Sequence, residues 1–161
     1  MNKLFQDKCR KLLAILIEKS FPELKNKKIF VFTTPFRKNY SGLALRFFWP
    51  IPRMIFINKK RNKESIGYLN GLLVHEICHL ALIERRGFIK SAFRGMLYWI
   101  FPKVRRAIED EVNQLAIQKG YSREIYLLEK KFEKKRIFSG IQKYYMTSEE
   151  IKNYAKSIKK W

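Results

Sequence analysis

The sequence Gly71-Leu72-Leu73-Val74-His75-Glu76-Ile77-Cys78-His79-Leu80-Ala81-Leu82-Ile83 is apolar except for His75, Glu76 and His79. We predict that residues 64–84 form one helix that includes this stretch. On a helix, residues four apart lie about 40° apart around the axis, so the two histidine side chains project together. Glu76 is offset from them by about 100°. Ile77 and Cys78 are expected to point into the core.

The three polar side chains of this helix need a common partner, because an unpaired polar group in an apolar setting is costly. A zinc ion bound by the two imidazole nitrogens supplies such a partner. Both histidines of the 161-residue chain lie in this motif, so its match to the HExxH pattern of zinc metalloproteases is not easily accidental. The alternative is a helix whose histidines are simply buried and hydrogen-bonded.

A catalytic zinc ion usually has three protein ligands and one open position for water. No third histidine is present, so the remaining ligand is expected to be a carboxylate or a cysteine. Residues 109–113 form an acidic cluster that offers Glu109 and Glu111, which point about 200° apart on a helix. We predict Glu109, because Asn113 lies one turn later and can orient a ligand histidine through its distal nitrogen. The alternative is a solvated acidic face.

These motifs resemble those of the gluzincin metallopeptidases, which pair an HExxH helix with a glutamate on a second helix. The string Glu109-Asp110-Glu111-Val112-Asn113-Gln114-Leu115-Ala116 is most similar to the corresponding helix of ImmA/IrrE-like peptidases. Thermolysin-like and Ste24-like groups usually carry aspartate where this chain has Asn113. The resemblance to SprT-like proteins is weaker, because their third ligand is a downstream histidine. The resemblance covers residues 64–120 and implies zinc ligands at His75, His79 and Glu109, with the general base at Glu76.

The implied activity is hydrolysis of peptide bonds by a zinc-activated water, whose proton Glu76 takes and later passes to the leaving amine. Such a reaction usually needs an electrophile for the oxyanion. Tyr121, Arg123 and Tyr126 are candidates because they follow the third-ligand helix closely in sequence. The alternative for each is an ordinary surface or core residue.

The remaining pattern predicts a mixture of helices and strands. Pro50 and Pro52 separate the last two strands, and at least one of these is expected at a sheet edge because proline cannot donate to a sheet. In zincins the substrate lies along an edge strand, and either residues 43–49 or residues 53–58 could serve as that strand. The alternative is that both are ordinary strands of the core sheet. The predicted helices are 3–20, 64–84, 88–101, 102–119, 122–137 and 148–160, and the strands are 29–33, 43–49 and 53–58.

These elements indicate the α+β class, with a zincin-like minimal metallopeptidase domain over residues 1–120. Residues 121–161 are expected to form a basic helical extension, packed on that domain or appended to it. Gly87 and Gly120 are expected to end helices. Thr147 and Glu150 form a predicted capping box for the last helix.

Residues 88–101 form an aromatic-rich helix with a narrow polar stripe at Lys90, Ser91 and Arg94. The segment is too short to span a membrane. We interpret it as a core helix. The alternatives are an active-site lid or a membrane-interface helix whose flanking cations snorkel, namely Arg85, Arg86, Lys103, Arg105 and Arg106.

The net charge of +21, from 35 Lys and Arg against 14 Asp and Glu, favours anionic partners. We expect salt-sensitive binding to nucleic acid or to an anionic membrane surface. The alternatives are a solvated basic face and a charged surface adapted to heat. The basic residues of the C-terminal region are Lys130, Lys131, Lys134, Lys135, Arg136, Lys143, Lys152, Lys156, Lys159 and Lys160, with Tyr144, Tyr145 and Trp161 among them.

The cellular setting predicted from the sequence is the cytoplasm, with a peripheral membrane location as the alternative. Two cysteines do not make a disulfide framework, and the N-terminal residues lack the apolar stretch of a signal peptide. The expected function is a zinc-dependent metallopeptidase. The alternatives are a non-catalytic zinc module that binds nucleic acid or anionic membrane through its basic face, and a zinc hydrolase that acts on a non-peptide amide.

Overall fold

The central helix of the protein is α2, Ile66–Arg86, which carries the histidine motif and packs against most other elements. The computed structural model describes residues 2–36, 41–45, 52–138 and 144–161. Ser65 caps the start of α2 by accepting a hydrogen bond from the Tyr68 amide, and Gly87 ends it with φ 81°. By length and composition α2 is apolar enough to cross a membrane, but most of it is buried inside the protein.

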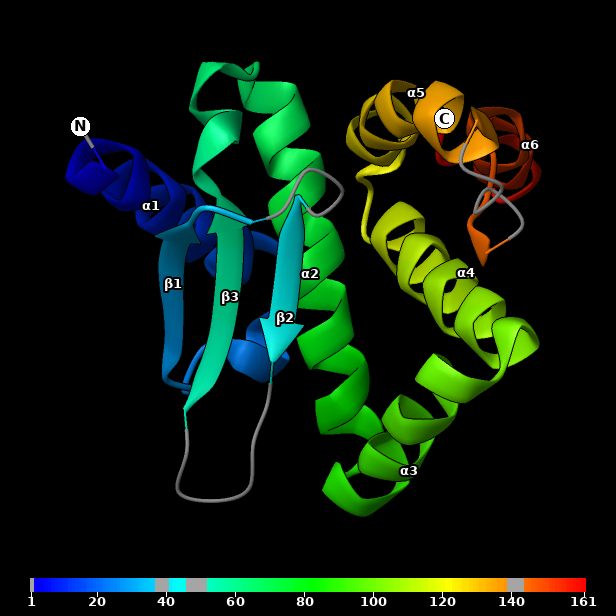
Figure 1. The fold of residues 1–161 in the computed structure, drawn as a ribbon, viewed down its shortest axis with the longest axis horizontal. Coiled ribbons are helices and arrows are strands. Elements are labelled where there is room, and N and C mark those ends of the chain that lie inside the picture. The colour runs from blue at the N-terminus through cyan, green and yellow to red at the C-terminus, as the bar shows by residue number, and fades with distance from the viewer. Residues whose placement is uncertain (1, 37–40, 46–51, 139–143) are drawn as a thin grey trace.

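A three-stranded mixed sheet packs beside α2 (Figure 1). The strands are β1 (Ile29–Thr34), β2 (Gly42–Leu45) and β3 (Arg53–Asn58), in the order β1-β3-β2. β3 runs parallel to β1 and antiparallel to β2. The expectation of an edge strand is confirmed for β2, whereas β3 is central. Residues 46–49 of the predicted second strand lie outside the described residues.

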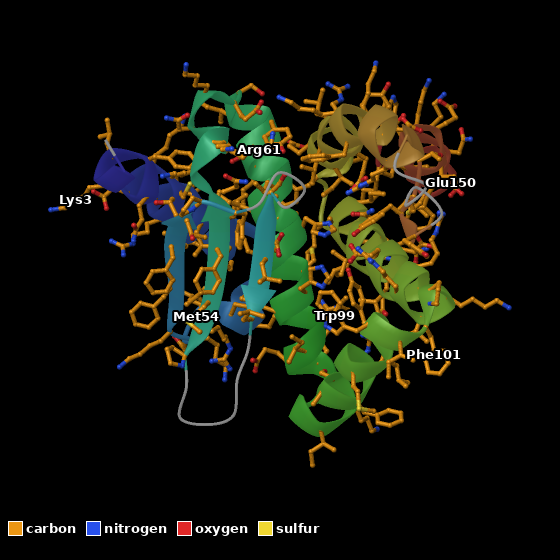
Figure 2. All side chains as sticks on the ribbon, viewed as in Figure 1. Lys3, Met54, Arg61, Trp99, Phe101 and Glu150 are labelled. Carbon is orange, nitrogen blue, oxygen red and sulfur yellow. The ribbon has the colours of Figure 1, made fainter. Side chains whose placement is uncertain are left out.

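The two faces of the sheet have different surroundings. α1 (Asn2–Ser20) packs against β1 and α2, on the side where Val31, Ile55 and Ile57 are buried. The opposite face is more open and carries stacked aromatic rings of Phe30, Phe32 and Phe56, and Figure 2 shows Met54 of β3 there. Two short 3-10 helices, η1 (Pro22–Leu24) and η2 (Lys59–Lys63), connect these elements.

The chain after α2 is helical: α3 (Phe88–Ile100), α4 (Pro102–Gln118), α5 (Ser122–Phe138) and α6 (Ser148–Ser157). α5 packs closely on α2, since a Cβ at Gly71 would lie only 2.3 Å from the carbonyl oxygen of Glu124. Ile125 and Ile151 belong to the core, so the C-terminal helices share it with the first 120 residues. The capping box of Thr147 and Glu150 is confirmed. The described residues therefore form an α+β fold of six α-helices and one small mixed sheet.

Two of the interpretations from sequence are wrong. α3 is not a core helix, because Ile89, Phe93 and Ile100 are exposed. Arg136 does not belong to a solvated basic face either, because it lies against the buried Glu129 and over the ring of Tyr145.

Candidate metal centre

His75 and His79 lie one turn apart on α2, and both side chains line one cavity. Their ring centroids are 5.0 Å apart. Ile77 and Cys78, between them in sequence, are fully buried in the core, as expected. The helical spacing therefore directs the two imidazoles to the same side and the apolar residues between them to the other.

Glu109 approaches the two histidines from α4. Its Oε2 atom lies 3.3 Å from Nε2 of His75 and 4.0 Å from Nε2 of His79. One potential ligand atom from each of the three residues lies within 4.8 Å of the others. Two imidazoles and one carboxylate from two helices thus form a buried group that could hold a metal ion.

Asn113, one turn after Glu109, orients His75. Its Oδ1 atom is 3.0 Å from Nδ1 of His75. An amide oxygen can only accept, so the Nδ1–H of His75 donates to it, and Nε2 is left facing Glu109. This is the arrangement predicted for Asn113 from the sequence, and it fixes the imidazole in the form that presents Nε2 to a metal.

The contact between His75 and Glu109 is one that either a proton or a metal ion can bridge. Glu109 Oε2 is buried and receives no hydrogen bond. In the neutral imidazole its neighbour Nε2 is also an acceptor, and two acceptors approach to 3.3 Å only when a proton or a metal ion lies between them. A metal ion satisfies Oε2 and both Nε2 atoms together, so the residues present fit one.

The electrostatics of the three side chains suit metal binding, because ligands must be deprotonated. Burial lowers the pKa of His79 to about 4, which keeps this imidazole neutral. Burial opposes ionisation of Glu109, but His75, His79 and Tyr98 outweigh it and lower its pKa to about 2. Burial likewise opposes protonation of His75, yet the carboxylate of Glu109 raises the pKa of its imidazole. A metal ion would therefore compete with a proton at His75.

Glu76 lies beside this group and is held by strand β2. Its carboxylate is buried and accepts a hydrogen bond from the backbone amide of Ala44. A Cβ at Gly42 would lie 2.5 Å from Glu76 Oε1, so only glycine leaves room for the carboxylate there. Burial raises the pKa of Glu76 to about 7, with His75 opposing the rise and Glu109 adding to it. A carboxyl group with this pKa can both accept and release a proton near neutral pH.

Tyr98 of α3 is a site residue that the sequence analysis missed. Its hydroxyl donates a hydrogen bond of 2.6 Å to Glu109 Oε1, the oxygen that faces away from the histidines. Glu111, the other carboxylate considered, pairs with Arg86 and Arg94 and is not part of the group with the histidines. The two glutamates therefore point in different directions, and only Glu109 faces the histidines.

A cavity of about 660 Å³ gives access to the site. Its wall includes Ser41 to Leu45 of the edge strand β2 and residues of α2, α3, α4 and α5. Arg105 is another wall residue that the sequence analysis did not select. Its guanidinium lies over the ring of Tyr98 at 5.1 Å and donates to the Tyr145 hydroxyl, while its Nε has no hydrogen-bond partner.

The three residues selected as oxyanion helpers lie outside this cavity wall. The Tyr121 hydroxyl is 2.7 Å from Ser20 Oγ, on the side of α1. Arg123 is exposed, and Tyr126 packs edge-on against Trp161. Proximity in sequence to Glu109 misled the selection, because the part of α5 that lines the cavity lies further along the helix, from Leu128 onward.

Comparisons with protein-family models, with curated proteins and with solved structures found no match to this chain. The candidate site is a group of His75, His79 and Glu109 that could hold a metal ion, with Glu76 buried beside it.

Proposed function

We propose that this protein is a zinc-dependent metallopeptidase. The observation that carries the proposal is the convergence of His75, His79 and Glu109, with Glu76 beside them but outside the ligand group. A general base is needed next to a hydrolytic metal and has no use at a purely structural one. The arrangement supports the gluzincin resemblance, nearest to the ImmA/IrrE-like peptidases, and a zincin-like fold around it.

Zinc is the metal that this ligand set favours. Two imidazoles and one carboxylate are the protein ligands of many catalytic zinc sites, which keep a fourth position open. The cavity beside the group supplies space for water and substrate at that position. Zinc held there would polarise a carbonyl and lower the pKa of a bound water toward neutrality.

Three side chains around the site are assigned the other roles in hydrolysis: proton transfer, positioning of Glu109 and stabilisation of the oxyanion. Glu76 takes the proton of the attacking water and delivers it to the leaving amine, a task that suits a carboxyl group whose pKa is about 7. Tyr98 holds the outer oxygen of Glu109 and so keeps the inner oxygen facing His75 and His79, which would hold the zinc with it. Arg105, a residue of the cavity wall, is our candidate for stabilising the oxyanion.

The edge strand β2 is our candidate for the substrate platform. It pairs with β3 on one side, and Ser41 to Leu45 belong to the cavity wall. An extended peptide can add to such an edge as a further strand, held by backbone hydrogen bonds. The strand that carries the substrate would then be the one that positions Glu76, through Gly42 and Ala44.

The proposal predicts metal-dependent peptide hydrolysis. Zinc-loaded protein is expected to cleave members of a mixed peptide library, detected by mass spectrometry. A chelator should stop the cleavage, and added zinc should restore it. Protein that holds zinc but cleaves no peptide would overturn the proposal. It would favour the non-catalytic zinc module, or a hydrolase of non-peptide amides if such substrates were turned over.

Replacement of Gly42 by alanine tests the role of β2 at Glu76. The added Cβ would lie 2.5 Å from Glu76 Oε1, so the carboxylate must move. Misplacement of a catalytic group by about 1 Å can cost about 10²-fold, so we expect cleavage to fall by about that factor while zinc content is unchanged. Gly67→Ala is the control, because its Cβ would make an ordinary 3.5 Å contact with Leu127. Wild-type cleavage by Gly42→Ala would show that Glu76 does not depend on this contact.

A further inference from the structure

Helix α3 has its apolar side turned away from the protein. Ile89, Phe93, Met96 and Ile100 follow one another at spacings of three and four residues, so they share one face, and all four are exposed. Three polar side chains of α3 lie on another side of the helix, on the wall of the cavity. Ser91 donates a hydrogen bond to the carbonyl of Gly87. Arg94 forms an ion pair with Glu111, and Tyr98 donates a hydrogen bond to Glu109.

This orientation is the reverse of that of a surface helix in a soluble protein, which buries its apolar stripe and exposes its charges. The internal partners of Arg94 and Tyr98 fix it, because rotating the helix would break both contacts. Phe101 extends the exposed apolar surface at the C-terminal end of α3, whereas Trp99, also exposed, lies on the cavity side of the helix (Figure 2). A contiguous apolar surface of this kind marks a place where something other than water binds.

The charges around this surface indicate what binds. Lys90 on α3 and Lys103 at the start of α4 are exposed, and neither is paired with a carboxylate in the described part of the chain. The whole chain carries +21, so a second copy would bring like charge to the contact. Nucleic acid would match the charge but would leave the large aliphatic and aromatic side chains without a partner. An anionic bilayer accepts both, since its headgroups attract lysine and its acyl boundary takes up apolar side chains.

We propose that α3 docks on the surface of an anionic membrane, with Ile89, Phe93, Met96 and Ile100 inserted at the level of the headgroups. α3 lies at one end of the molecule, so it can meet a flat surface before other elements do (Figure 1). The same helix reaches the metal centre through Tyr98. The docking does not depend on the proposed hydrolysis. If both hold, the cavity opens close to the bilayer, where polypeptide segments near the membrane are within reach.

Vesicle co-sedimentation of the full chain tests the docking. The wild type is expected to bind vesicles of phosphatidylcholine with phosphatidylglycerol at physiological salt. Ile89→Ser combined with Phe93→Ser, which changes side chains 83% and 60% exposed, should weaken binding by about a hundredfold, since each large apolar side chain contributes about one factor of ten or more. The matched control is Leu4→Ser with Ile15→Ser on α1, 81% and 61% exposed, which should bind like the wild type.

Trp99 gives a second, independent measurement. In a Trp49→Phe, Trp161→Phe protein it is the remaining tryptophan of the three in the chain, and it is exposed on the cavity side of α3, next to Ile100 of the proposed docking face. Its emission is expected to shift to shorter wavelength when anionic vesicles are added, because the indole leaves water.

Four outcomes would overturn the proposal. The first is a wild type that does not bind these vesicles. The second is binding that the α3 double variant retains in full, which would mean attraction by charge alone. The third is a wild-type dimer that the same variant converts to a monomer, which would assign α3 to a second copy. The fourth is duplex DNA binding that depends on Ile89 and Phe93 while Trp99 emission does not respond to vesicles.

Discussion

Glu76→Gln is expected to retain zinc and the fold but to lose about 10²- to 10⁴-fold in cleavage rate, the range that general base catalysis contributes. The amide has the shape of the carboxyl group and can still accept the hydrogen bond from Ala44. It cannot take a proton from water at neutral pH. Because Glu76 is outside the ligand group, the metal should not respond to the change.

The test measures zinc content and single-turnover cleavage of one library substrate on the same preparations. Together the two measurements distinguish a general base from a zinc ligand at position 76. Loss of zinc from Glu76→Gln would identify Glu76 as a ligand and remove it as the base. Undiminished cleavage would move the general base to another residue. The thermal unfolding midpoint serves as the control for folding.

Glu109→Ala is expected to weaken zinc affinity by more than about a hundredfold. The substitution removes the carboxylate that faces both Nε2 atoms. Asn113→Ala removes only the hydrogen bond to His75 Nδ1, and loss of such a supporting contact typically costs about 10- to 100-fold. Glu111→Ala is the matched control on the same helix, because Glu111 pairs with Arg86 and Arg94 instead. We expect its zinc affinity to equal that of the wild type.

Competitive titration against a chromophoric chelator orders the three variants. The expected order of affinity loss is Glu109→Ala, then Asn113→Ala, then Glu111→Ala. Glu111 and its two arginine partners are partly exposed and lie outside the ligand group, so the control should also remain folded. A larger loss in Glu111→Ala than in Glu109→Ala would contradict the ligand assignment and the gluzincin resemblance with it.

The residues that meet at the candidate metal centre could be predicted because helical spacing fixes their relative directions. His75 and His79 are four apart, and so are Glu109 and Asn113, so each pair presents two side chains on one face. Amphipathicity distinguishes Glu109 from Glu111 only weakly. The stronger reason was chemical, since only the residue four after Glu109 can bond an imidazole, and the contact of Asn113 with His75 agrees with it.

The side chains that complete the site could not be predicted because their positions depend on packing between distant elements. Tyr98 reaches Glu109 because α3 presents its polar stripe to α4, whereas a periodic apolar pattern is normally taken to mark the buried face. Ser91, Arg94 and Tyr98 fall on one face at helical spacing, and this shared polar face is the sequence signal that could have identified Tyr98 as a site residue. Gly42 is a glycine within a strand, a pattern that can mark the close approach of another group.

The fold was predicted best where a local signal ends an element. Gly87 and Gly120 have φ of 81° and 94°, a backbone region open to glycine, and each follows a helix where expected. The order of the strands depends on long-range pairing, so the sequence indicated an edge strand without deciding which one. In the structure β3 is the central strand: β1 pairs with it in parallel orientation and β2 in antiparallel orientation.

Metal analysis of protein purified without chelators and supplied with zinc tests the central claim most directly. The account predicts about one zinc per chain in the wild type and none retained by His75→Ala or His79→Ala, because the Nε2 atoms of both face Glu109 Oε2. A wild type that holds no transition metal, or that prefers iron to zinc, would contradict it, as would zinc that remains bound after both histidines are replaced.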